Sequence, residues 1–163
     1  DGMFAISIYD LKKKQLILAR DPMGIKPLYY TLTKNSLFFS SSIKSFYFQK
    51  KINNEAIIDF FSLGFIREPN TILQNVQSLE PGQLYLYKDN TLKKKKFFDL
   101  KTIFNNEETK DVQLEIEKSV IKHYTNEVSS CLFLSSGIDS NIILSLLKKN
   151  DLGNLLCIKV FII

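Results

Sequence analysis

Residues 132–149 read LFLSSGIDSNIILSLLKK, and no other segment of the 163-residue chain says as much about its fold. The apolar run 131–134 predicts a buried strand, and the amphipathic run 141–149 predicts a helix. A turn of small, hydroxyl-bearing residues joins the two. A strand, a small-residue turn and a helix N-terminus form an arrangement that binds phosphate, because backbone N–H groups and the positive end of the helix dipole converge on one anion.

The side chains of this turn suit the same chemistry. Gly137 lets the backbone approach a ligand closely, and Asp139 supplies a carboxylate where Mg²⁺ can join it to phosphate oxygens. Hydroxyl donors come from Ser135, Ser136 and Ser140. The alternative is an ordinary strand-to-helix turn with a serine cap. No Gly-Lys-Ser/Thr follows the turn, so it is not a Walker loop.

The turn resembles the Ser-Gly-Gly-x-Asp-Ser pyrophosphate loop of ATP pyrophosphatases, enzymes that split ATP to AMP and pyrophosphate while adenylating a substrate. Ser136 departs from that pattern, which has its first glycine at this position. A serine is strained there if the position requires a positive φ, and it is tolerated if φ is negative.

Composition excludes several classes of protein. With 45% hydrophobic and 12% aromatic residues, the chain can bury a core. The net charge of +5 does not indicate nucleic-acid binding, because Lys12–Lys14 and Lys93–Lys96 are expected in polar connections and most aromatics fall in strand-like runs. No apolar run reaches the roughly 20 residues of a membrane span. Cys131 and Cys157 are expected to be reduced core residues of a cytoplasmic protein rather than metal ligands.

The first hundred residues predict many strands and one short helix. The expected strands are Met3–Tyr9, Leu16–Ala19, Leu28–Tyr30, Leu37–Phe39, Gln83–Tyr87 and Lys96–Phe98, and the expected helix is Asn53–Leu63. Many strands with few helices predict an antiparallel sheet packed on one or two faces. Another helix, Val112–Tyr124, is expected before the phosphate-binding turn.

Two further features concern charged residues. Arg20, Asp21 and Lys26 lie in a loop bounded by prolines and a glycine, where we expect them to pair with one another and brace an interface between domains rather than to act in catalysis. His123 is the only histidine, and we expect a surface or capping role for it near the end of its helix.

Several short segments, taken in order, resemble a known family. The segments DGMFA (1–5), ARDPMGIKPLYY (19–30) and FSSSIK (39–44) resemble the second half of a class II glutamine amidotransferase domain. The segments REPNTI (67–72) and LEPGQ (79–83) resemble the stretch that closes this domain in glutamine-dependent asparagine synthetases. The pyrophosphate loop follows in the expected order. The whole chain thus resembles an internal segment of an asparagine synthetase-like protein, and both of its ends look cut.

The resemblance implies a fold of class α+β followed by α/β. Residues 1–100 would form the strand-rich part of an N-terminal-nucleophile glutaminase domain, and residues 101–110 a linker. Residues 111–163 would begin a parallel-sheet ATP-pyrophosphatase domain of the adenine nucleotide alpha hydrolase-like type. In the family, glutamine is hydrolysed in the first domain, and ammonia passes through a tunnel to attack β-aspartyl-AMP in the second. The implied substrates are glutamine, aspartate and ATP, with Mg²⁺ as cofactor and a homodimer as the expected assembly.

The resemblance also implies site residues. Asp1 maps to the aspartate that binds the α-amino group of glutamine, a pairing that suits a carboxylate. The ATP-contacting loop maps to Leu134, Ser135, Ser136, Gly137, Asp139 and Ser140, with Asp139 placing Mg²⁺. Ile163 is the closest match to a main-chain position that meets adenine, and a plain core residue is the alternative there. The nucleophilic N-terminal cysteine of the family has no counterpart in this chain, so no catalytic residue is assigned.

Two departures from the family keep alternatives open. Ser42 stands where the family usually has a glutamate, and Ser136 stands where the loop usually has a glycine. The leading expectation is an ATP-dependent amidoligase that makes asparagine from aspartate with glutamine as nitrogen donor. One alternative is the same machinery acting on another carboxylate acceptor. The other is a non-catalytic remnant.

Overall fold

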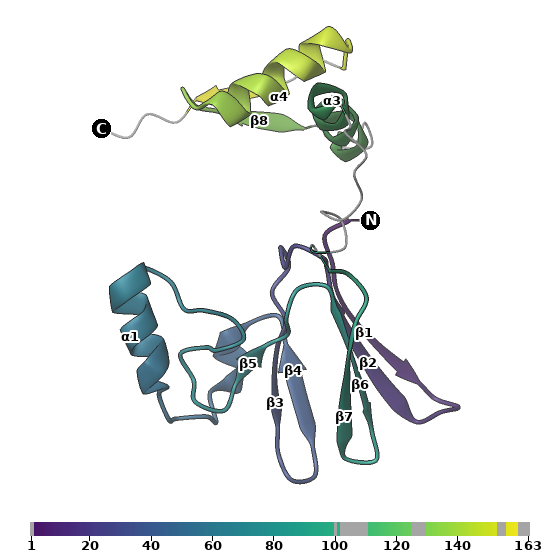
Figure 1. Ribbon diagram of the computed structural model, residues 1–163, viewed down its shortest axis with the longest axis vertical. Coiled ribbons are helices and arrows are strands. Elements are labelled where there is room, and N and C mark those ends of the chain that lie inside the picture. The colour runs from purple at the N-terminus through teal and green to yellow at the C-terminus, as the bar shows by residue number, and fades with distance from the viewer. Residues whose placement is uncertain (1, 100, 102–110, 125–129, 153–155, 160–163) are drawn as a thin grey trace. The chain divides into compact units, whose positions relative to one another are not determined.

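The computed structural model describes residues 2–99, 101, 111–124, 130–152 and 156–159. The chain divides into two units, Asp1–Asn106 and Glu107–Ile163. Figure 1 shows both units, with most of their helices and strands labelled.

The described part of the first unit contains two antiparallel sheets (Figure 1), so the predicted antiparallel pairing is confirmed, but the strands divide between two sheets rather than forming one. One sheet has the strand order β1 (Ala5–Asp10), β2 (Gln15–Arg20), β6 (Gln83–Lys88) and β7 (Thr91–Lys96). The other has the order β4 (Leu37–Ser40), β3 (Tyr29–Leu32) and β5 (Gln77–Ser78). The two-residue strand β5 was not predicted from the sequence.

The hairpin of β6 and β7 corrects one predicted strand. Asp89 and Asn90 have φ of 48° and 57°, so they form a two-residue turn of the kind that favours tight hairpins. This turn pairs Lys88 with Thr91 directly and starts β7 at once. The predicted strand Lys96–Phe98 is therefore wrong. Lys93–Lys96 lie within β7 rather than in a polar connection, although their side chains are exposed as expected.

Among the described residues of the first unit, a cluster of buried side chains joins the two sheets. Its members are Leu18, Leu28, Tyr30, Leu79 and Tyr85. The rings of Tyr30 on β3 and Tyr85 on β6 meet edge to face, with centroids 5.3 Å apart. Edge-to-face pairing adds to the stabilisation that the buried area alone provides. The core therefore lies where strands of different sheets face one another.

Helix α1 (Asn54–Leu63) begins and ends on local signals in the sequence. The side chain of Asn53 accepts a hydrogen bond from the Glu55 N–H at 3.1 Å, which caps the N-terminus. Gly64 ends the helix with a φ of 80°, and its N–H donates to the Phe60 carbonyl at 2.9 Å. The 3₁₀ helix η1 (Ile43–Phe46) was not predicted.

The second unit contains a strand–helix–strand arrangement with parallel strands. Helix α3 (Val112–His123) precedes β8 (Cys131–Leu134), α4 (Ile138–Lys149) and β9 (Leu156–Lys159). Strands β8 and β9 pair in parallel, with Cys131 opposite Leu156. Helix α4 begins three residues earlier than the predicted Asn141, because the hydroxyl-rich turn runs directly into the first helical turn.

The two cysteines correct another expectation. Both are free thiols, but both are exposed rather than buried. Along β8 exposure alternates, so that Cys131 and Phe133 are exposed while Leu132 and Leu134 are half-buried. Only one face of β8 is covered, because successive side chains of a strand point to opposite faces.

Among the helices that the structure describes, none combines the length and the apolar character needed to cross a membrane.

Candidate functional site

The turn between β8 and α4 is organised around two serine hydroxyls. The Gly137 N–H donates to Ser135 Oγ at 3.1 Å, and the Ser135 N–H donates to Ser140 Oγ at 3.2 Å. The two hydroxyl oxygens lie 3.1 Å apart. Ser135, Gly137 and Ser140, which were singled out from the sequence, are thus in direct contact in the structure.

Asn141 closes this turn, a role that was not predicted for it beyond its place in the helix. Its Nδ2 donates to the Gly137 carbonyl at 2.7 Å and to the Ser135 carbonyl at 3.2 Å. These bonds give both carbonyl oxygens a partner within the turn and hold the turn against the first turn of α4. The role could have been predicted from the sequence, because an asparagine in the first turn of a helix readily hydrogen-bonds to nearby backbone groups.

The N-terminus of α4 offers hydrogen-bond donors. Gly137 is its N-cap, with φ −70° and ψ 149°, and no side chain of the described residues caps the first turn. The N–H groups of the first helical turn have no partner within the helix, and the helix dipole gives this end a partial positive charge. Asp139 and Ser136 are exposed beside these donors, and Leu134 is half-buried at the end of β8.

The backbone of the turn settles the interpretation of Ser136. Positive φ occurs among the described non-glycine residues at Lys14, Asp89, Asn90 and Asp151, and Ser136 is not one of them. Serine is therefore tolerated at this position without strain. Gly137 also has a negative φ, but a Cβ added there would lie 3.1 Å from Ser135 Oγ. A close hydroxyl, rather than a special backbone conformation, is what favours glycine at residue 137.

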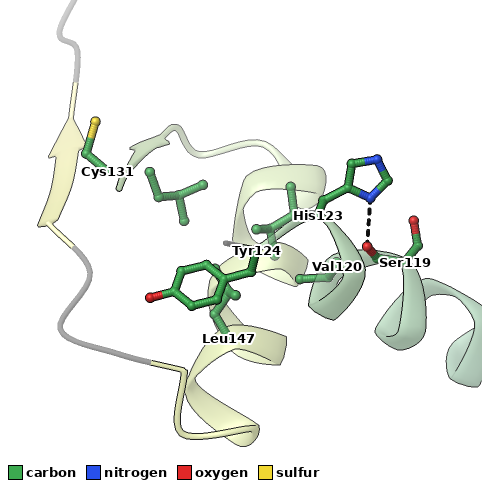
Figure 2. Close-up of a pocket in the computed structure, with 8 residues that line it drawn as sticks. Ser119, Val120, His123, Tyr124, Cys131 and Leu147 are labelled. Atoms are coloured by element: carbon green, nitrogen blue, oxygen red, sulfur yellow. Dashed lines mark hydrogen bonds between the residues drawn. The ribbon is translucent and has the colours of Figure 1, made fainter. Parts of the chain in front are cut away.

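A separate pocket of about 320 Å³ lies in the second unit (Figure 2). Its lining residues are Ser119, Val120, His123, Tyr124, Cys131, Leu132, Ile143 and Leu147. The lining is mostly apolar and carries no acidic or lysine side chain. His123 is exposed, and its Nδ1 lies 2.8 Å from the Ser119 carbonyl oxygen, which confirms the predicted surface position. This pocket therefore offers fewer groups that can bind a phosphate than the β8–α4 turn does.

In the first unit, Arg20 is the centre of a buried polar network. Arg20 is 5% exposed, and its guanidinium donates to five oxygens at 2.6–2.9 Å: Gly24 O, Lys26 O, Glu68 Oε1, Ser78 Oγ and Leu79 O. Two of these partners, Glu68 and Ser78, lie 48 and 58 residues away in sequence. The network therefore ties the loop after β2 to distant segments of the same unit.

Asp21 organises the same loop through backbone N–H groups. Its carboxylate accepts hydrogen bonds from the N–H groups of Met23, Ile25 and Lys26 at 3.0–3.1 Å. Burial by itself would raise the pKa of Asp21, but these backbone hydrogen bonds outweigh it and hold the pKa below its ordinary value. The expected mutual pairing of Arg20, Asp21 and Lys26 side chains is wrong, because Lys26 contributes only its backbone.

Two predicted site residues, Asp1 and Ile163, lie outside the described residues.

Comparison with known proteins defines the class of protein first. Residues 1–98 match the family of the glutamine amidotransferase domain, so the chain belongs to that family. Over nearly its whole length it is also similar to glutamine-hydrolysing asparagine synthetases. The resemblance predicted from the sequence is thereby confirmed.

Three of these relatives come from Bacillus subtilis (strain 168). Asparagine synthetase [glutamine-hydrolyzing] 1 is 36% identical over 156 residues, which cover 91% of this chain and 25% of the relative. Asparagine synthetase 2 is 33% identical over 161 residues, covering 85% of this chain and 21% of the relative. Asparagine synthetase 3 is 26% identical over 152 residues, covering 88% of this chain and 25% of the relative. The chain spans a quarter or less of the length of each.

The similarity reaches beyond the glutamine amidotransferase domain. The family match ends at residue 98 of 163, whereas the similarity to asparagine synthetase 1 covers 91% of the chain. That similarity must therefore extend into the second unit, Glu107–Ile163.

Proposed function

We propose that the protein containing this chain is an ATP-dependent amidoligase that makes asparagine from aspartate. Glutamine is the nitrogen donor, and β-aspartyl-AMP is the intermediate. The observation that carries this proposal is the 36% identity to an asparagine synthetase along 91% of the chain, across both units. A cytoplasmic location and a homodimeric assembly remain predictions.

The proposal divides the two half-reactions between the two units. Residues 1–100 belong to the glutaminase part, residues 101–110 are the linker, and residues 111–163 begin a domain of the ATP-pyrophosphatase type. Support for the last assignment comes from the parallel pair β8–β9 with α4 between them in sequence. Open parallel sheets bind ligands at the carboxyl ends of their strands, and the Ser135–Ser140 turn follows the carboxyl end of β8.

In this proposal the β8–α4 turn binds the pyrophosphate portion of ATP. The N–H groups at the start of α4 and the hydroxyls of Ser135 and Ser140 donate to phosphate oxygens, Ser136 contributes its backbone N–H, and Leu134 contacts the nucleotide. As the aspartate carboxylate attacks the α-phosphorus, negative charge moves onto the departing pyrophosphate. The Asn141 bonds hold the Ser135 and Gly137 carbonyls and so the backbone of the turn. Donors on a backbone held in this way stabilise the charge without having to reorganise. Ile163 is proposed near adenine, and Asp1 is proposed to bind the α-ammonium group of glutamine.

The chemistry of the turn fits a Mg²⁺ ion carried with ATP. Mg²⁺ in such sites takes one or two carboxylates together with substrate phosphates and waters, rather than a cage built wholly from protein. Asp139 supplies one exposed carboxylate beside the donors that would hold phosphate. Among the described residues, no three His, Cys, Asp or Glu side chains gather into a cage. Asp139 would hold the ion, which when bound supplies charge neutralisation to the phosphates.

The direct test uses the full-length protein with glutamine, aspartate and ATP. We expect asparagine, glutamate, AMP and pyrophosphate to form in equimolar amounts, measured by chromatography and a coupled pyrophosphate assay. Formation of ADP in place of AMP would contradict adenylation. Turnover of another carboxylate substrate, with none of aspartate, would support the same class of reaction with a different acceptor. A folded full-length protein that turns over no acceptor would favour the non-catalytic remnant.

We expect Ser136→Gly to leave ATP affinity within about fivefold of the unaltered protein. The serine is unstrained, so its removal relieves nothing, and the added backbone freedom costs at most about 1 kcal/mol. Titration calorimetry of the full-length protein with ATP and Mg²⁺ measures the change. Ser136→Ala is the matched variant, because it removes the hydroxyl alone. A loss of affinity above about tenfold in both variants would show that the hydroxyl itself binds ATP, since one hydrogen bond to a charged group has that value.

A further inference from the structure

The hydroxyl of Ser140 has more acceptors within reach than it has protons to donate. Its oxygen lies 3.3 Å from the Ser135 carbonyl oxygen, 3.2 Å from the Gly137 carbonyl oxygen and 3.1 Å from Ser135 Oγ. A serine hydroxyl carries one proton, so it donates to one of these oxygens at a time. If that proton is given to a ligand, the carbonyls of the turn need another donor.

Asn141 offers a donor to each of the two carbonyls. Its Nδ2 lies 2.7 Å from the Gly137 carbonyl oxygen and 3.2 Å from the Ser135 carbonyl oxygen. Carbonyl oxygens can only accept, so the amide nitrogen, with its two N–H groups, is the atom that faces them. Each carbonyl therefore has two side-chain donors within reach, one from Ser140 and one from Asn141.

This double supply makes the Ser140 proton dispensable to the turn. A hydroxyl hydrogen rotates to suit its partners. When it rotates away, both carbonyls keep an N–H of Asn141, and Ser140 Oγ still accepts from the Ser135 N–H at 3.2 Å. Without the amide of Asn141, the same rotation would cost a carbonyl its hydrogen bond.

We propose that Asn141 is a positioning residue for ATP, because by supplying both carbonyls of the turn it frees the Ser140 hydroxyl to donate its proton to a phosphate oxygen. This inference rests on the proposed function, in which the β8–α4 turn binds the pyrophosphate portion of ATP. Asn141 itself touches no phosphate in this arrangement. It acts through the Ser140 hydroxyl, so its contribution to ATP affinity exists only while that hydroxyl is present.

The test is a double-mutant cycle in the full-length protein, with the Kd for ATP and Mg²⁺ measured by titration calorimetry in the absence of aspartate. We expect Asn141→Ala to raise this Kd about tenfold, the fold-change that one lost hydrogen bond causes. In a Ser140→Ala protein the same substitution should raise the Kd less than about twofold, because no hydroxyl proton remains to be redirected.

A merely structural role for Asn141 predicts a different result. If its amide only held the turn together, Asn141→Ala would raise the Kd by the same factor in both backgrounds, since independent effects add. An equal rise in both, or no rise in the protein that keeps Ser140, would overturn the inference. Should Asn141→Ala not fold, Asn141→Ser is measured in the same two backgrounds, because its hydroxyl can still supply one carbonyl. Its rise in Kd should again require Ser140, and a rise that does not would overturn the inference.

Asn150→Ala is the matched control. Asn150 lies at the other end of α4, and its Nδ2 also donates to two oxygens, the Leu146 carbonyl at 2.9 Å and Glu117 Oε1 at 2.8 Å. Its loss removes a similar pair of hydrogen bonds from the same helix, and we expect the Kd for ATP to stay unchanged. A rise equal to that of Asn141→Ala would overturn the inference, because it would reflect loosening of α4 as a whole.

Ser140→Ala by itself separates this inference from the proposed function. It should raise the Kd for ATP about tenfold, because the hydrogen bond to phosphate is lost. If it does so and Asn141→Ala does not, the positioning role fails and the phosphate-binding role of the turn stands. If Ser140→Ala leaves the Kd unchanged, or the folded unaltered protein binds no ATP, the proposed role of the turn fails and the inference fails with it.

Discussion

Asp139→Ala in the full-length protein is expected to lower ATP-dependent asparagine synthesis by about 100-fold or more while glutamine hydrolysis continues. Asp139 is exposed in the first turn of α4, and no hydrogen bond or ion pair of the described residues depends on its side chain, so its loss should not disturb the fold. In the proposed function, its carboxylate is the acidic group that the turn offers beside the phosphates of ATP. Synthesis supplied with ammonia measures the second half-reaction, and glutamate release from glutamine measures the first.

Two further variants test whether the effect is due to the charge of Asp139 itself. Asp139→Asn keeps the size of the side chain and removes only its charge, so it should lose nearly as much activity as Asp139→Ala. Glu115 is an acidic residue in the first turn of the neighbouring helix α3, and Glu115→Ala should leave both activities unchanged. Equal loss of synthesis and glutamine hydrolysis in a folded Asp139→Ala protein would refute the role assigned to this carboxylate.

Local patterns in the sequence predicted those elements whose boundaries are set by neighbouring residues. The β1–β2 hairpin places Ala5 opposite Arg20, as the alternation of apolar runs and a polar turn indicates. Helix α1 starts at its asparagine cap and stops at Gly64. The strand–turn–helix at residues 131–149 was recognisable for the same reason, because each of its signals lies within a few residues of the feature that it controls.

Contacts between distant residues could not be read from such patterns. Arg20 bonds to Glu68 and Ser78, which no periodicity connects to it, so the sequence showed a charged loop but not its partners. The start of β7 depends on the positive φ of Asp89 and Asn90, a property of the folded turn. Likewise, the exposure of Cys131 depends on which face of β8 is covered, and an apolar strand alone does not reveal that.

Arg20→Met is expected to lower the free energy of unfolding of the first unit by roughly 3–5 kcal/mol, the range seen when one partner is removed from a buried charged network. Methionine fills much of the same volume but leaves the carbonyls of Gly24, Lys26 and Leu79 without their donor, and unsatisfied buried acceptors are costly. Glu68 has a side chain that is 39% exposed, so water can solvate its charge once the guanidinium is gone. Urea unfolding of the full-length protein, followed by the fluorescence of its tyrosines, measures the loss.

Lys26→Met is the control within the same loop. Arg20 and Asp21 use only the carbonyl and the N–H of Lys26, and its side chain is exposed, so this change should alter stability by no more than about 0.5 kcal/mol. Arg20→Lys should lower the free energy of unfolding nearly as much as Arg20→Met does. A single ammonium group cannot bond to all five oxygens that the planar, forked guanidinium reaches. If Arg20→Lys retained full stability, charge alone would explain the network. The geometry of the guanidinium, which reaches residues 24, 26, 68, 78 and 79 at once, would then not be what holds these segments together.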